Sequence, residues 1–151
     1  MADYYGLNTD GYFTVYNTAQ DAAFGPRTGI TGTGYCPDAS GQCFVTFNGA
    51  PTPTKTNYQV IETDYSSYSV VYSCSSTKAY LWLLSREPVA SDSLYKYMLL
   101  SAKAMLPNFD FNDLNIRDYQ GSKCSYLSDA NQFLQWFSLS NNFIMMNPIN
   151  I

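Results

Sequence analysis

Short β-prone segments follow one another closely through the first half of the chain, and this spacing restricts the folds available to it. About seven runs rich in Tyr, Val, Phe and Leu precede residue 85, and Gly, Pro, Asn, Asp or Ser bounds each of them. Asp10-Gly11 between two such runs is typical of a hairpin turn, because glycine accepts positive φ. With no helical pattern between these runs, we expect an antiparallel meander.

One helix is predicted after the strands, over about residues 91–106. Ser91 or Asp92 can cap its start, and Pro107 ends it. Its apolar positions recur at helical spacing: Leu94, Met98, Ala102 and Met105. A meander closes most easily into a barrel, which removes exposed strand edges. We therefore expect one all-β domain over residues 1–151, an eight-stranded antiparallel up-and-down barrel with the helix packed on its wall.

Composition excludes several classes of function. The 151 residues include 8 Lys and Arg against 12 Asp and Glu, a net charge of −4, so a nucleic-acid-binding surface is not expected. The chain has no histidine, which excludes Ser-His-Asp and Cys-His catalysis and His-based metal sites. We expect no metal site and no enzymatic activity. No apolar run approaches the ~18 residues of a membrane span, and the first residues do not resemble a signal peptide.

The cysteines indicate an oxidising compartment. Their number is even, and they lack the paired C-x-x-C spacing of a zinc site: Cys36, Cys43, Cys74 and Cys124. Two disulfides are the better interpretation, and we therefore expect a secreted protein.

Alternating aromatic side chains predict a cavity wall. Two sets alternate with their neighbours along predicted strands: Tyr68, Val70 and Tyr72 with Ser69, Val71 and Ser73, and Tyr80, Trp82 and Leu84 with Leu81 and Leu83. We expect both sets to face the interior, where a barrel of this size has room for one small ligand. The candidate ligand-binding residues are Tyr58, Val60, Tyr68, Val70, Tyr72, Tyr80, Trp82 and Phe44. The alternative is that these side chains fill a core or pack under the helix.

Several segments together resemble the lipocalin family, in particular its apolipoprotein D and bilin-binding branch. Residues 58–74 (YQVIETDYSSYSVVYSC) resemble a strand–turn–strand region of that branch, and residues 81–88 (LWLLSREP) resemble the third lipocalin motif. Residues 5–17 (YGLNTDGYFTVYN) are similar to its second and third strands. The resemblance covers roughly two thirds of the chain and implies a ligand-binding barrel.

The first lipocalin strand is displaced in this resemblance. Residues 129–143 (DANQFLQWFSLSNNF) resemble it, although the motif glycine is absent. The resemblance thus implies a circular permutation, with the first strand at about 132–144; alternatively, this strand completes a neighbour's barrel and gives a homo-oligomer. It further implies that Arg86 packs over Trp136, that Cys74 bonds to Cys124, and that Cys36–Cys43 closes a hairpin.

The function implied by the resemblance is carriage of a small hydrophobic ligand, such as a carotenoid, bilin, retinoid or lipid. The abundance of tyrosine favours an oxygen-bearing pigment, since phenols stack and donate hydrogen bonds. Lys55, Lys78 and Arg27 lie in predicted loops and could reach the barrel mouth. Two alternatives remain: a structural, self-assembling protein that uses its C-terminal strand, and an isomerase-like enzyme that uses Cys or carboxylates.

Overall fold

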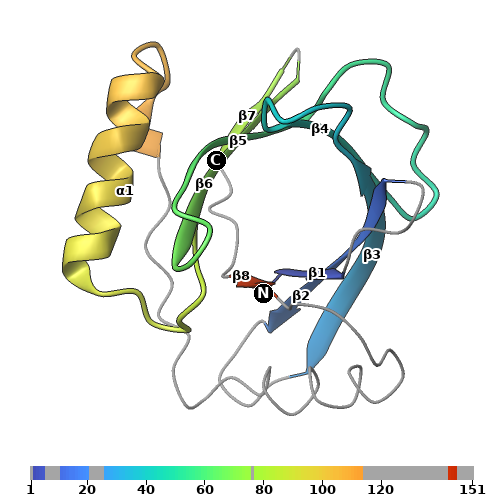
Figure 1. The fold of residues 1–151 in the computed structure, drawn as a ribbon, viewed down its shortest axis with the longest axis horizontal. Coiled ribbons are helices and arrows are strands. Elements are labelled where there is room, and N and C mark those ends of the chain that lie inside the picture. The colour runs from blue at the N-terminus through green and yellow to red at the C-terminus, as the bar shows by residue number, and fades with distance from the viewer. Residues whose placement is uncertain (1, 6–10, 21–25, 76, 114–142, 146–151) are drawn as a thin grey trace.

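The computed structural model describes residues 2–5, 11–20, 26–75, 77–113 and 143–145. Six strands form a curled antiparallel sheet (Figure 1): β2 (Tyr12–Gln20), β3 (Arg27–Tyr35), β4 (Gln42–Phe47), β5 (Tyr58–Thr63), β6 (Tyr68–Cys74) and β7 (Ala79–Ser85). The strands pair in chain order, as expected of a meander. The prediction of an all-β fold with one helix is therefore confirmed.

Two short strands extend the sheet beyond β2. β1 (Ala2–Tyr5) pairs with β2, and β8 (Phe143–Met145) pairs antiparallel with β1, so that two segments far apart in the sequence are neighbours in one sheet. Among the described residues the hydrogen-bonded order runs from β7 at one edge to β8 at the other. The closed eight-stranded barrel stays a prediction, and most of the predicted strand at 132–144 lies outside the described residues.

Helix α1 (Asp92–Met105) begins and ends where its sequence predicts. The Ser91 hydroxyl accepts a hydrogen bond from the Leu94 amide, which satisfies one of the free N–H groups of the first turn. Asp92 in the first turn and Lys103 in the last turn both oppose the helix dipole. Pro107, just after the C-cap residue Leu106, prevents the helix from continuing.

One face of α1 packs on strands β6 and β7. Met98 and Ala102 are buried against Val70, Leu81 and Leu83, which are also buried. Full burial of a side chain the size of leucine stabilises the fold by about 1.5–3 kcal/mol. In Figure 1 the helix lies outside the curled sheet, beside β6, and the remaining strands curl away from it. The helix therefore covers the convex side of the sheet, and the opposite side is concave.

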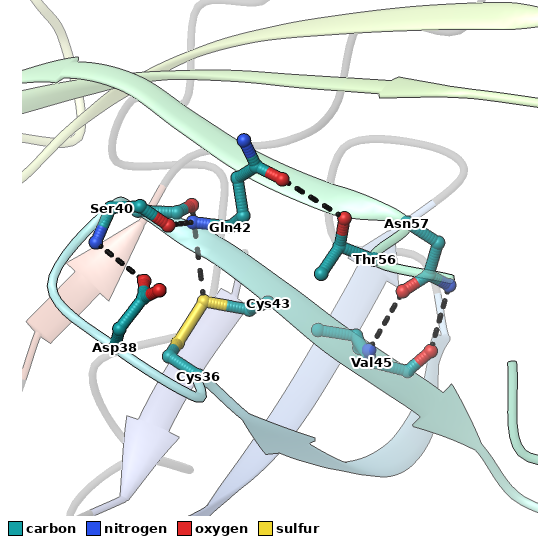
Figure 2. Close-up of a disulfide and its surroundings, with 9 residues drawn as sticks. Cys36, Asp38, Ser40, Gln42, Cys43, Val45, Thr56 and Asn57 are labelled. Atoms are coloured by element: carbon teal, nitrogen blue, oxygen red, sulfur yellow. Dashed lines mark hydrogen bonds between the residues drawn. A yellow bond between two sulfur atoms is a disulfide. The ribbon is translucent and has the colours of Figure 1, made fainter. Parts of the chain in front are cut away.

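The Cys36–Cys43 disulfide closes the connection between β3 and β4. Its two Cα atoms lie 4.2 Å apart, and the bond joins the residue after β3 to the second residue of β4. Figure 2 shows how the side chain of Asn57 holds the neighbouring strand, donating to the Val45 carbonyl at 2.9 Å and accepting from the Val45 amide at 2.8 Å. This predicted disulfide is confirmed, and it holds the start of β4 beside the end of β3.

Candidate functional site

The pairing register of β6 with β7 decides which side chains face the concave side. Val71 lies opposite Trp82 and Ser73 opposite Tyr80, whereas Val70 lies opposite Leu83. Directly paired residues share a face, and successive residues alternate between faces. Val70 and Leu83 pack against α1, so the Val71–Trp82 and Ser73–Tyr80 pairs face the concave side.

Three aromatic rings form a stack on this concave face. Trp82 stacks with Tyr80 on the same strand at 5.6 Å between ring centroids, and with Tyr58 of β5 at 6.2 Å. Beside them, Val71 is fully buried and Leu84 is 4% exposed. All three rings are only half-buried, so part of each ring surface is exposed. The concave face thus carries an aromatic wall over β5–β7, formed by Tyr58, Tyr80 and Trp82.

The concave face continues across β4, β3 and β2 with apolar side chains. Cys43 pairs with Tyr58, and Val45 and Val15 are buried on the same side of the sheet. Two glycines of β3 leave space for phenylalanine rings from the neighbouring strands. A Cβ on Gly32 would lie 2.8 Å from the Phe47 ring, and a Cβ on Gly34 would overlap the Phe13 ring. The small β3 residues therefore let large rings from both neighbouring strands lie over that strand.

The expectation that Tyr68, Val70 and Tyr72 face the interior is wrong. Val70 is buried under α1, Tyr68 meets Tyr97 of α1 edge-on at 5.7 Å, and Tyr72 meets Phe109 at 6.1 Å. Their alternate residues Ser69, Val71 and Ser73, which were expected outside, occupy the concave face instead. The physical reason is that α1 needs an apolar surface to pack on, and these side chains supply it.

The prediction that Phe44 lines the cavity is also wrong. Phe44 lies opposite Tyr35 and alternates with Cys43 and Val45, so it belongs to the convex face. The four remaining candidates share the concave face: Tyr58, Val60, Tyr80 and Trp82. Val60 pairs with Val71, which pairs with Trp82, and each of the two tyrosines lies two positions along its strand from one of these residues. Whether these residues bind a ligand stays a prediction.

A carboxylate between the sheet and the helix escaped the sequence analysis. Glu62 of β5 accepts hydrogen bonds from the hydroxyls of Tyr97 at 2.8 Å, Tyr68 at 3.0 Å and Ser101. Partial burial raises the pKa of Glu62, but the hydroxyl donors of Ser101, Tyr97 and Tyr68 outweigh it and hold the pKa below its usual value. A β-bulge between Val60 and Glu62 turns this side chain to the helix side. Its role there is to anchor α1.

The predicted mouth cations Lys55 and Lys78 lie at the opposite end of the meander from Arg86. Lys55 and Lys78 are exposed in the β4–β5 and β6–β7 connections, which lie at the same end of a meander. Arg27 is the first residue of β3, and its side chain is not described. Arg86, at the other end, donates to the Tyr65 carbonyl at 2.9 Å, while Trp136 lies outside the described residues.

The remaining site predictions concern cysteines and metals. Cys74 is exposed and forms no disulfide with another cysteine of the described residues; its predicted partner Cys124 lies outside them, so the Cys74–Cys124 bond stays a prediction. Within the part of the chain that the structure describes, no cluster of three or more His, Cys, Asp or Glu residues could hold a metal ion. None of the described helices has the length and apolarity to cross a membrane.

A separate recess lies on the convex side, at the end of α1. It has a volume of about 370 Å³, and Tyr72, Leu106, Pro107 and Phe109 contribute to its walls. Tyr72 faces the helix, so this recess and the aromatic wall lie on opposite faces of the sheet.

Comparison with known families agrees with this geometry. The family model of the lipocalin-like domain matches residues 1–118, which is most of the chain. The chain therefore belongs to the lipocalin-like domain family. No curated protein matches it.

Proposed function

We propose that this protein is a carrier that holds one small apolar ligand against the concave face of its sheet. Membership of the lipocalin-like family suggests binding of a small hydrophobic molecule. The observation that carries the proposal for this chain is the aromatic wall, in which Tyr58, Trp82 and Tyr80 are stacked yet only half-buried. The described strand positions on this face carry no Lys, Arg, Asp or Glu, so an apolar ligand meets no buried charge there.

The physical basis of binding is removal of apolar surface from water. A ligand that buries ~300 Å² of apolar surface gains about 7 kcal/mol before the costs of association, at ~25 cal/mol per Å². The wall is built on paired strands, so few side chains need to be ordered on binding. Flat conjugated molecules suit stacked rings, and we therefore favour a carotenoid or similar pigment over a bilin, a retinoid or a saturated lipid.

We propose binding without chemistry and a secreted location. The absence of carboxylates and amines from the described concave positions supports the first. The Cys36–Cys43 disulfide supports the second, because such bonds persist in oxidising compartments.

We further propose that the C-terminal strand β8 takes the place of a first lipocalin strand, as a circular permutation would produce. Support comes from the pairing of Ala2 with Met145 and of Tyr4 with Phe143, together with the approach of β8 to β7 at the far edge. The same pairing between two chains would give a swapped, self-assembling protein. Light scattering during size exclusion separates the two arrangements: the proposal expects 16.9 kDa at all concentrations, and a mass that grows with concentration contradicts it.

The experiment that tests the carrier function is a mass spectrum and an absorption spectrum of an organic extract of the protein purified from its native source. We expect one conjugated apolar compound in a ratio of about one per chain. A colourless protein whose extract matches that of an unrelated control protein contradicts the proposal.

A further inference from the structure

Two buried side-chain oxygens on the sheet have no hydrogen-bond partner in the part of the chain that the structure describes: Ser69 Oγ and Asn17 Oδ1. Ser69 is only 7% exposed. Most buried polar atoms in folded proteins are paired, because an unpaired one has lost its bonds to water without replacement. These two atoms are therefore candidates for hydrogen bonds to a bound ligand.

Both oxygens belong to the concave face. Ser69 lies opposite Leu84 and alternates with Val70, which packs under α1. Asn17 lies on the same face of β2 as Val15 and Phe13, and the Phe13 ring covers Gly34. They are thus on the side that carries the aromatic wall.

The two positions lie toward opposite ends of the sheet. Ser69 is the second residue of β6, beside the turn at residues 64–67, and Asn17 is near the end of β2. β2 and β6 run in the same direction, since each of the intervening pairings is antiparallel. Apolar side chains lie between them on the same face, among them Val71 and Trp82. The face thus presents a polar atom near each end and an apolar surface in the middle.

The chemistry of these two atoms restricts the ligand. An amide oxygen only accepts hydrogen bonds, and a serine hydroxyl donates or accepts. A ligand hydroxyl satisfies either atom, whereas a carboxylate cannot donate to Asn17 and finds no Lys or Arg among the described concave positions. We infer that the ligand is an elongated apolar alcohol whose hydroxyl bonds to Ser69 Oγ, with Asn17 placed to accept from a second donor. This inference rests on the proposed carrier function and deepens it.

The test compares all-trans-retinol with all-trans-retinoic acid and with the hydrocarbon axerophthene, in which a methyl group replaces the CH2OH end of retinol, so that it can neither donate nor accept a hydrogen bond. Affinities are measured by fluorescence titration of the full chain. Retinol should bind about tenfold more tightly than the other two, which is the worth of one buried hydrogen bond. Ser69→Ala should remove the preference for retinol over the hydrocarbon while leaving the affinity for the hydrocarbon within twofold.

A second readout separates recognition from a structural role of Ser69. Because Ser69→Ala deletes an unpaired buried hydroxyl, it should raise the Tm of the ligand-free protein while weakening retinol binding. The matched control is Thr33→Val, which removes an exposed hydroxyl from the opposite face of β3 and should change neither quantity.

The outcomes distinguish this inference from the carrier function itself. Equal, saturable binding of all three retinoids overturns the alcohol specificity and leaves the carrier function standing. A Ser69→Ala variant with lower Tm and equally weakened binding of every retinoid assigns Ser69 a structural role, which also overturns the inference. If none of the three binds saturably, both proposals fail.

Discussion

Trp82 of β7 stacks on Tyr58 of β5 with ring centroids 6.2 Å apart, although β6 lies between the two strands. The stack therefore crosses above β6, on the side where Val71 pairs with both Val60 and Trp82. This contact joins the rings of β5 and β7 into one aromatic surface on the concave face, and α1 packs on the opposite face of the same part of the sheet.

The aromatic wall can be tested with one matched pair of tyrosines. Tyr80 stacks on Trp82 on the concave face, and Tyr12 stacks on Tyr35 at 5.0 Å on the other face. We expect Tyr80→Ala to weaken binding of an apolar fluorescent probe about tenfold, because a stacked ring is worth about 0.5–1.5 kcal/mol beyond its buried area. Tyr12→Ala should leave the affinity within twofold. Similar losses in both variants would argue against a site on the concave face.

The packing of α1 on the convex face can be tested with two leucines. Leu81 is fully buried beneath the helix, whereas Leu100 on the helix is 68% exposed. Leu81→Ala should lower the free energy of unfolding by about 2–5 kcal/mol, and Leu100→Ala should lower it by less than about 1 kcal/mol. Urea denaturation measures both. A comparable loss in the two variants would contradict the assigned burial.

The Glu62 anchor predicts a specific dependence of stability on pH. Its pKa is lower in the folded protein than in the unfolded chain, so its contribution is present above the unfolded pKa of about 4.3 and is lost as the pH falls. Glu62→Gln should therefore be less stable than the wild type at pH 7, by about 1 kcal/mol, and the difference should shrink by pH 3. Denaturation midpoints at the two pH values give the answer.

The control for this experiment is Glu87→Gln, which changes an exposed carboxylate in the segment after β7. It should track the wild type at both pH values. The Asp64 carboxylate, whose pKa is lowered by the Ser67 hydroxyl and nearby backbone amides, is present in all three proteins and cancels in the comparison. An unchanged gap between Glu62→Gln and the wild type from pH 7 to pH 3 would contradict the anchor.

The cysteines can be assigned by counting thiols before and after reduction. Cys36–Cys43 should be found as a linked peptide, and its removal by Cys36→Ser with Cys43→Ser should destabilise the fold by about 2 kcal/mol. The predicted Cys74–Cys124 bond requires that the native protein show no reactive thiol. Two reactive thiols in the oxidised protein would contradict that second bond and leave the first intact.

Local patterns in the sequence were sufficient to locate most elements. The meander predicted before residue 85 corresponds to strands β1–β7, and the helix predicted over about 91–106 coincides with α1 to within a residue at each end. Both depend on short-range chemistry: alternating β-prone residues, the Ser91 cap and the block at Pro107. The same locality explains the success at Cys36–Cys43, whose partners are separated by only 7 positions.

The assignment of faces could not be predicted in the same way. Alternation tells which residues of β6 share a face, but both faces of this strand are buried, one under α1 and one on the concave side. Val70 and Val71 are therefore equally apolar, and only the pairing of Cys74 with Ala79 across the turn decides which of them meets Trp82. Glu62 was missed because its partners Tyr97 and Ser101 are distant in sequence.

The central claim is that an apolar ligand contacts the aromatic wall, and Trp82 reports on it directly. The chain has two tryptophans, so Trp136→Phe leaves Trp82 as the single indole emitter. Titration of this variant with all-trans-retinol should quench the Trp82 emission saturably, with an endpoint of one retinol per chain. Emission that stays unchanged while retinol binds, or quenching that rises linearly without saturation, would contradict the account.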